Sequence, residues 1–199
     1  SEDFDIWYLE RSAASTNWSD PIHPEATFNT SANEFYPSLT ILGDLYFTSD
    51  RPGSKGKDDI FCAPFQHGRY GEVYSLSDSI NTDGMEYNAW VAPSGKALIF
   101  GSYNRPDGFG SGDLYVSFVN PDGSWSKAAN LGEPVNSDKM DYCPYVDLNR
   151  AVFYFTSRRA ADNNVFSEDY LQEQQEFPGG RSRLFSIKLE AVGLLSEIR

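Results

Sequence analysis

Carboxylates recur at the same position in three similar segments of this 199-residue sequence. Each segment begins with Asn and then Thr or Ser, and after three further residues it has a carboxylate followed by an aromatic residue. The carboxylates are Glu34, Glu86 and Asp141. Three acids held close together can bind a cation, act as general acid and base, or attract a basic partner. The structural alternative is that each acid accepts hydrogen bonds from backbone amides or pairs with an arginine of a neighbouring repeat.

Arginines recur as well, each shortly after a short apolar segment that ends in serine. The set comprises Arg51, Arg105, and either Arg158 or Arg159. An aspartate follows the arginine in the first two repeats, which predicts an ion pair across a hairpin. The predicted pairs are Arg51 with Asp59 and Arg105 with Asp113. Because Arg183 replaces this aspartate in the last repeat, we expect an unpaired arginine there. The last repeat is therefore the better place for the alternative, an anion or uronate clamp of guanidinium groups.

The spacing of these residues predicts a repeat of about 50 residues that contains four short strands. The leading asparagines, Asn29, Asn81 and Asn136, are 52 and 55 residues apart. Between them, segments rich in aromatic and β-branched residues alternate with Gly, Pro, Asn and Asp, as is typical of antiparallel strands and turns. The predicted strands are Asp5–Glu10, Asn17–His23, Phe35–Thr40, Asp44–Ser49, Asp59–Phe65, Tyr70–Leu76, Tyr87–Ala92, Ala97–Ser102, Asp113–Val119, Ser124–Ala129, Tyr142–Asp147, Ala151–Ser157 and Arg183–Leu189.

Tandem units of four short antiparallel strands are typical of β-propeller blades. If the strands of a blade are named a to d from the inside outward, the chain reads cd, abcd, abcd, abc, an all-β fold of about three and a quarter blades. The expected units of this single domain or fragment are approximately 1–30 (partial), 31–83, 84–138 and 139–199 (partial). Closed propellers have roughly four to eight blades. We therefore expect a partial or unclosed ring, which another chain or a missing segment completes.

Composition excludes several classes of function. The formal charge is −13, from 16 Lys plus Arg against 29 Asp plus Glu, and this disfavours a nucleic-acid binder or a polybasic membrane-surface protein. The longest apolar run, Ala151–Phe155, has five residues, whereas a membrane-spanning helix needs roughly 20. Aromatic residues make up 15% of the chain, which indicates a globular protein. Cys62 and Cys143 permit a single disulfide at most, and the sequence leaves open whether they are bonded.

The stretch from Phe35 to Phe61, FYPSLTILGDLYFTSDRPGSKGKDDIF, resembles the TolB-like, WD-like β-propeller repeat of bacteria. The later unit, with Phe100-Gly101-Ser102 and Arg105-Pro106 before Asp113-Leu114-Tyr115, is similar. The resemblance implies a recognition platform in a periplasmic or extracellular protein, and related propellers serve as substrate-gating or catalytic domains of hydrolases and lyases. The last unit departs from the pattern at Arg183, so the role of the repeat aspartate is altered there.

Strand a is the innermost strand of a blade, so its side chains are the first candidates for a binding site. One of its faces is apolar in all three units and is predicted to lie in the core. The other face begins with the recurrent acid and then carries a varied set of side chains, whose rings could stack on sugars or be buried between blades. The predicted binding residues of this face and of the last arginine pair are Glu34, Tyr36, Glu86, Asn88, Trp90, Asp141, Tyr145, Arg158 and Arg159.

Other catalytic and metal motifs have little support. The only histidines are His23 and His67, and the sequence contains no GxSxG elbow for a hydrolytic triad. The glycine-rich segments 53–58 and 108–113 could be calcium loops, but each occurs once, and hairpin turns explain them more simply. We therefore expect no cofactor and no metal, with calcium as the alternative.

The segment Ala160–Ser182 interrupts the repeat, and its part Ser167–Phe177 has the composition of a short acidic helix with a Ser cap. It is interpreted either as a recognition loop or as a solvated loop. The leading hypothesis is a non-enzymatic recognition or scaffold module of an exported bacterial protein, which binds a protein or glycan at the strand-a end. The alternative is a carbohydrate-active hydrolase or lyase that uses paired carboxylates among Glu34, Glu86 and Asp141. A third hypothesis is an accessory set of blades from a larger exported peptidase.

Overall fold

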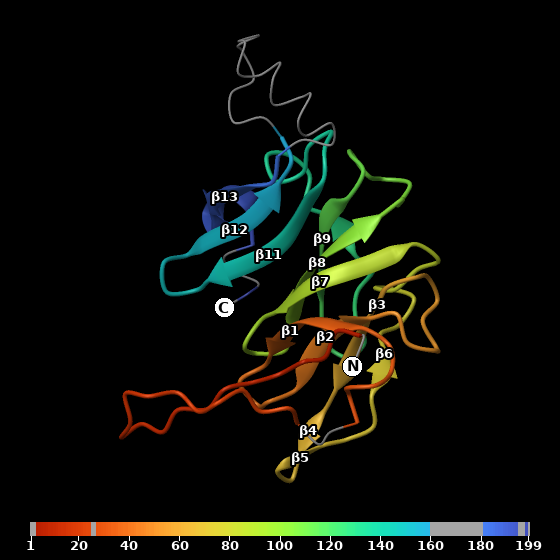
Figure 1. Cartoon of the computed structure of the whole chain (residues 1–199). Coiled ribbons are helices and arrows are strands. Elements are labelled where there is room, and N and C mark those ends of the chain that lie inside the picture. The colour runs from red at the N-terminus through yellow and green to blue at the C-terminus, as the bar shows by residue number, and fades with distance from the viewer. Residues whose placement is uncertain (1–2, 25–26, 160–180, 195–197, 199) are drawn as a thin grey trace.

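The computed structural model describes residues 3–24, 27–159, 181–194 and 198. The predicted recognition loop lies outside the described residues, apart from its last two positions. The described residues form short strands and one 3-10 helix, η1 (Leu189–Val192) (Figure 1). The strands are β1 (Glu34–Leu39), β2 (Leu45–Ser49), β3 (Asp59–Ala63), β4 (Phe65–Gln66), β5 (Arg69–Tyr70), β6 (Tyr74–Ser75), β7 (Met85–Val91), β8 (Ala97–Tyr103), β9 (Asp113–Phe118), β10 (Ala129–Asn130), β11 (Asp141–Asp147), β12 (Val152–Ser157) and β13 (Arg183–Lys188).

The strands form antiparallel sheets that follow chain order. Two sheets have four strands, in the orders β1-β2-β3-β6 and β7-β8-β9-β10, and a third sheet has the order β11-β12-β13. Figure 1 shows the second sheet between the first and the third. This confirms the predicted all-β fold of four-stranded propeller blades, with strand a at β1, β7 and β11. Among the described residues, no helix is both long and apolar enough to span a bilayer.

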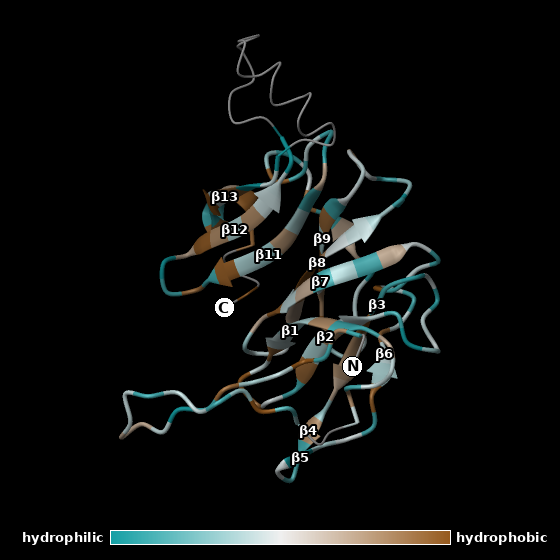
Figure 2. Cartoon of the chain, in the orientation of Figure 1, coloured by the Kyte–Doolittle hydropathy of each residue, from teal (hydrophilic) through white to brown (hydrophobic). Residues whose placement is uncertain are grey.

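Apolar residues of consecutive sheets pack against each other and form the core. One core cluster joins Tyr46, Ile60 and Cys62 of the first sheet to Ala89 and Leu98 of the second. A second cluster joins the second sheet to the third in the same way. Figure 2 shows the hydrophobic residues concentrated on the strands, while most peripheral loops are hydrophilic. Each sheet is therefore stabilised mainly by its neighbours, as in other repeat architectures.

Strand a is irregular at the same place in all three sheets. The register with strand b shifts within β1, β7 and β11, and a residue with positive φ lies at each shift: Tyr36 (53°), Asn88 (55°) and Cys143 (52°). Such a β-bulge re-aims the side chains around it. The prediction that one face of strand a is apolar along its whole length is therefore wrong. Residues beyond the bulge lie on the opposite face of the sheet from the one that strict alternation predicts.

The outer and N-terminal strands are shorter than predicted. The strands expected at Tyr70–Leu76 and Ser124–Ala129 are reduced to β6 and β10, and the expected N-terminal pair is reduced to a single bridge between Tyr8 and Ile22. The chain instead forms a separate hairpin, β4–β5, through a turn whose His67 and Gly68 have positive φ.

Candidate functional site

Each recurrent acid forms a buried ion pair with an arginine of the same sheet, and we call these three pairs the acid–arginine joints. The joints are Glu34–Arg51 (2.9 Å), Glu86–Arg105 (3.1 Å) and Asp141–Arg159 (2.7 Å). In each joint the acid begins strand a, and the arginine follows the end of strand b. The three acids are at most 1% exposed. In the described structure these carboxylates are therefore shielded from solvent.

The Thr or Ser after each leading asparagine donates further hydrogen bonds to the acid. Thr30 donates from its backbone N and its hydroxyl to Glu34 (2.8 and 2.7 Å), and Thr82 does the same to Glu86 (2.7 and 2.8 Å). Ser137 donates twice to Asp141 (2.7 and 2.8 Å). This explains why Thr or Ser precedes the acid at a fixed spacing, because one tight turn satisfies the carboxylate oxygens.

The arginine of each joint connects three parts of the structure. Arg51 donates to Glu34, to Ser49 at the end of β2, and to the carbonyl oxygen of Phe28 in the preceding connection. Its guanidinium also lies over the rings of Phe47 and Phe61, 4.8 and 5.1 Å from their centroids. Burial lowers the pKa of Arg51, although Glu34 acts in the opposite direction. The joint therefore holds strands a and b to the connection from the previous blade.

The predicted ion pairs of Arg51 with Asp59 and of Arg105 with Asp113 are wrong. Asp59 accepts hydrogen bonds from the backbone N of Lys55 and Gly56, and Asp113 accepts them from Phe109 and Gly110. The glycine-rich loops therefore close on these aspartates, which leaves the arginines free to pair with the strand-a acids. Among the described residues, no three His, Cys, Asp or Glu side chains form a group suited to a metal ion.

The prediction of an unpaired arginine in the last repeat is wrong for Arg159. Arg159 pairs with Asp141, and it stacks over Phe155 and Phe185. The buried Nε of Arg158 has no hydrogen-bond partner in the described part of the chain.

The leading asparagines have a structural role that the sequence reading missed. Asn81 accepts from the backbone N of Ile60 (3.0 Å) and donates to its carbonyl oxygen (2.8 Å). Asn29 holds Ile6 in this way, and Asn136 holds Leu114. The nearly constant distance of 22 to 24 residues from each asparagine back to an Asp-aliphatic-aromatic segment was the signal that could have revealed this bond.

The polar side chains that do converge are those of the strand-a bulges, Tyr36, Asn88 and Cys143, which we call the bulge cluster. They come from β1, β7 and β11, and all three are half-buried. The Tyr36 hydroxyl donates to the carbonyl oxygen of Pro144 (3.2 Å). The Asn88 amide lies 3.5 Å from the Cys143 sulfur. Residues from three different sheets thus meet at one place.

The groups in the bulge cluster are neutral at physiological pH. Burial raises the pKa of Tyr36 well above its usual range, and Cys143 raises it further. Burial also raises the pKa of the Cys143 thiol. Because the thiolate is the nucleophilic form of cysteine, the raised pKa makes the Cys143 thiol less reactive at neutral pH. Both Cys143 and Cys62 are free thiols, so the disulfide is absent.

The aromatic residues predicted at the site lie in different environments. Trp90 is buried between the second and third sheets, where it belongs to the core. Tyr145, at the equivalent position of β11, is 57% exposed. Its ring lies 6.5 Å from that of Tyr154. The difference arises because no sheet of the described residues covers the outer face of the third sheet.

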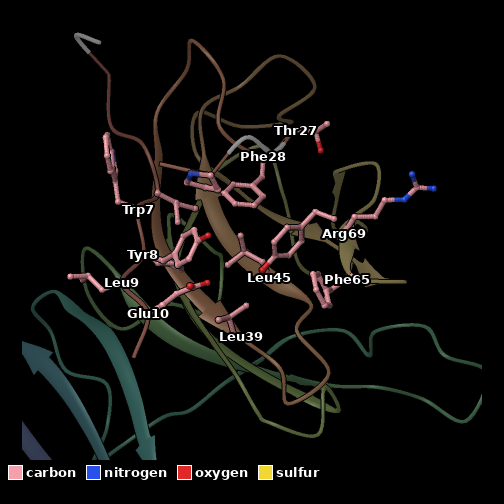
Figure 3. Close-up of a pocket in the computed structure, with 15 residues that line it drawn as sticks. Trp7, Tyr8, Leu9, Glu10, Thr27, Phe28, Leu39, Leu45, Phe65 and Arg69 are labelled. Carbon is pink, nitrogen blue, oxygen red and sulfur yellow. The ribbon is translucent and has the colours of Figure 1, made fainter. Parts of the chain in front are cut away.

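A groove lies between the N-terminal segment and the first sheet, and the sequence reading missed it. Its volume is about 1180 Å³. Figure 3 shows Trp7, Tyr8 and Leu9 of the N-terminal segment on one side and Leu39, Leu45 and Phe65 of the first sheet region on the other. These side chains make the groove predominantly apolar.

Comparisons with known proteins show similarity only at the level of solved structures. No model of a protein family matches the sequence, and no match was found among curated proteins. A structure from Agrobacterium tumefaciens that is assigned as TolB aligns with a TM-score of 0.46 and 16% identity, over 81% of this chain and 52% of that one. The tricorn protease aligns with a TM-score of 0.43 and 15% identity, over 85% of this chain and 15% of that one. The chain thus spans about half the length of the first of these proteins. The fold assignment rests on the sheets themselves.

Proposed function

We propose that this chain is a non-enzymatic recognition and scaffold module of an exported protein, located in the periplasm or outside the cell. In this proposal it binds a protein or glycan at the strand-a end through the bulge cluster, and Tyr145 on the outer face of the third sheet is a further contact. The exported location rests on the resemblance to TolB-like repeats. The partner class rests on the chemistry of strand a, which offers neutral hydrogen-bonding groups in the bulge cluster and an exposed ring at Tyr145.

The observation that carries the proposal is the left-handed backbone at Tyr36, Asn88 and Cys143. A left-handed conformation costs a residue with a side chain roughly 1–2 kcal/mol, and such strain is concentrated at functional sites. Glycine would relieve the strain at each position, yet each keeps a polar side chain. The carboxylates, in contrast, are buried in the acid–arginine joints. A glycosidase needs acids in contact with its substrate, so this geometry favours recognition over hydrolysis.

The test is a binding screen of the full chain on a glycan array and against candidate proteins, followed by variants of the strand-a face. For any ligand found, Asn88→Ala and Tyr145→Ala should each weaken binding at least about tenfold if they are central contacts. Tyr74→Ala is the matched control, because Tyr74 is 50% exposed but lies on the outer strand β6. Equal binding by all three variants would contradict the proposed site, and turnover of a bound glycan would contradict the non-enzymatic role.

A further inference from the structure

A second recurring position lies six residues before each leading asparagine, and we call its three members the linker residues. They are His23, Ser75 and Asn130. Each linker residue lies within hydrogen-bond distance of two side chains. One is the amide of the leading asparagine, and the other is the aspartate of the Asp-aliphatic-aromatic segment. The same three-residue contact is therefore built three times with three different linkers.

The serine and asparagine linkers can serve both neighbours at once. The Ser75 hydroxyl accepts from the Asn81 amide (2.9 Å) and can donate to Asp59 (3.3 Å). Asn130 accepts from Asn136 through its side-chain oxygen (2.7 Å), and its side-chain nitrogen donates to the aspartate of the same blade (3.4 Å). Hydroxyl and amide groups each contain both a donor and an acceptor, so no linker proton has to move in these two blades.

His23 has the same two neighbours but offers both of them one atom. Its Nε2 lies 3.2 Å from an Asp5 carboxylate oxygen and 3.1 Å from the Asn29 side-chain nitrogen. The orientation of the Asn29 amide is fixed, because its oxygen accepts from the backbone N of Ile6 and its nitrogen donates to the Ile6 carbonyl oxygen. A ring nitrogen is either a donor or an acceptor. His23 can therefore bond to Asn29 only without a proton on Nε2, and to Asp5 only with one.

We propose that His23 is a proton-controlled switch, whose ring bonds to Asn29 when it is neutral and to Asp5 when it is protonated. The neutral ring carries its proton on Nδ1, and Nε2 accepts from the Asn29 amide. Protonation places a second hydrogen on Nε2, which then donates a charge-assisted hydrogen bond to the Asp5 carboxylate. The Asn29 amide then faces an N–H group and loses this acceptor. Histidine is the side chain whose charge ordinarily changes between about pH 5 and 8.

The groups around His23 allow this exchange of partners. The N-terminal segment presents Asp5 and the uncharged ring of Trp7, whose centroid lies 4.8 Å from that of His23. The connection to β1 presents the uncharged amide of Asn29. The His23 side chain is 41% exposed and that of Asp5 is 11% exposed. Protons can therefore reach the ring from solvent, while the carboxylate that receives the protonated ring is mostly buried.

The switch acts where the N-terminal segment is attached to the first blade. Asn29 is the side-chain bridge from this connection to Ile6. Its neighbours belong to the first acid–arginine joint, since Phe28 accepts from Arg51 and Thr30 donates to the acid of that joint. Protonation of His23 thus changes the bonding of the residue that connects the N-terminal segment to this joint. The serine and asparagine linkers make the corresponding attachments in the next two blades insensitive to pH over this range.

NMR spectra of the ¹⁵N-labelled full chain, recorded between about pH 5 and 8, test the switch. The ring nitrogen signals of neutral His23 should show the proton on Nδ1, because Nε2 accepts from Asn29. As His23 becomes protonated, the side-chain amide signals of Asn29 should shift with the same midpoint.

Matched variants separate the switch from a general effect of pH. His23→Ser introduces the linker of the next blade, so the Asn29 signals should no longer respond over this range. His67→Ser removes the other histidine, which lies in the exposed β4–β5 turn, and should leave the Asn29 response unchanged. Asp5→Asn removes the carboxylate that receives the protonated ring, so the Asn29 response should move to lower pH.

Three results would each overturn the proposal. They are a neutral His23 with its proton on Nε2, Asn29 signals that do not follow the titration of His23, and an unchanged response in His23→Ser. The strand-a site takes no part in these measurements, so the switch and the proposed function can each fail alone.

Discussion

Two positions of strand a that are two residues apart differ in charge, burial and backbone conformation. The first position carries Glu34, Glu86 or Asp141, which are charged, buried and fully engaged by internal partners. The second carries Tyr36, Asn88 or Cys143, which are neutral, half-buried and held in a left-handed conformation. Recurrence in a repeat therefore does not indicate function by itself. The recurrent acids hold each blade together, while the variable residues after them form the candidate binding site.

The largest effect is expected from breaking an acid–arginine joint. Glu86→Ala would leave Arg105 largely buried and without its counter-ion, which typically costs about 3–5 kcal/mol. Urea denaturation should show the loss as a lower free energy of unfolding.

Asp138→Ala is the control for this loss, because its ion pair with Lys139 is exposed and such pairs contribute about 1 kcal/mol or less. A similar loss in both variants would mean that the buried joint contributes no more than a surface ion pair.

The next effect tests whether the leading asparagine belongs to the same structural framework. Asn81→Ala removes the bonds to both backbone groups of Ile60 and leaves them buried without their side-chain partner. An unsatisfied buried polar group costs roughly 1–3 kcal/mol, so the free energy of unfolding should fall by about 2 kcal/mol or more. Asn120→Ala is the control, since Asn120 bonds to Ser124 in an exposed turn. If the two variants have the same free energy of unfolding, the hydrogen bonds from Asn81 to Ile60 do not contribute to stability.

The sequence predicted the strands that are buried on both faces, and it overestimated the length of the outer strands. β2 and β3 are fully buried runs of aromatic and branched residues, so composition alone indicated them. β6 and β10 have only two residues each, and the loops around them carry the same turn-forming residues. The bulges at Asn88 and Cys143 lack the glycine that normally marks positive φ, so the sequence contained no signal for them.

The pairing of the charged residues could be predicted only in part. The prediction that each acid accepts backbone hydrogen bonds or pairs with an arginine is confirmed. It placed that arginine in a neighbouring repeat, however, and it paired the arginines of the first two repeats with the wrong aspartates. Asp59 is closer to Arg51 in sequence than Glu34 is, and a hairpin was expected to bring the nearer pair together. Which partner Asp59 takes depends on nearby backbone amides. The backbone N–H groups of Lys55 and Gly56 donate hydrogen bonds to the Asp59 carboxylate, so it does not need an arginine. The position of these amides follows from loop geometry, which residue types do not specify.

A smaller effect is expected at the second position of strand a. Asn88→Gly removes a side chain from a residue with φ of 55°, which relieves strain, while glycine adds conformational entropy to the unfolded state. These terms oppose each other, so the free energy of unfolding should change by about 1 kcal/mol or less in urea denaturation. Binding of any strand-a ligand should be lost in the same variant.

Asn88→Val makes the opposite change, because a β-branched side chain is strongly disfavoured at positive φ. It should destabilise the protein relative to Asn88→Gly. If instead Asn88→Gly were as damaging as Glu86→Ala, the two positions would share one structural role and the contrast between them would fail.

The smallest effect concerns reactivity and not stability. Burial raises the pKa of the Cys143 thiol, so at neutral pH the group is protonated and reacts slowly with a disulfide reagent. As pH rises, the thiolate forms later than in a free thiol, and the reaction rate should continue to increase after that of glutathione has levelled off. The Cys143→Ser variant assigns the signal, because Cys62 is only 2% exposed and should react more slowly still. A fast reaction at pH 7 that disappears in Cys143→Ser would reveal an activated thiol at the bulge cluster. Such a thiol would favour a nucleophilic, catalytic role for Cys143 over the proposed recognition role.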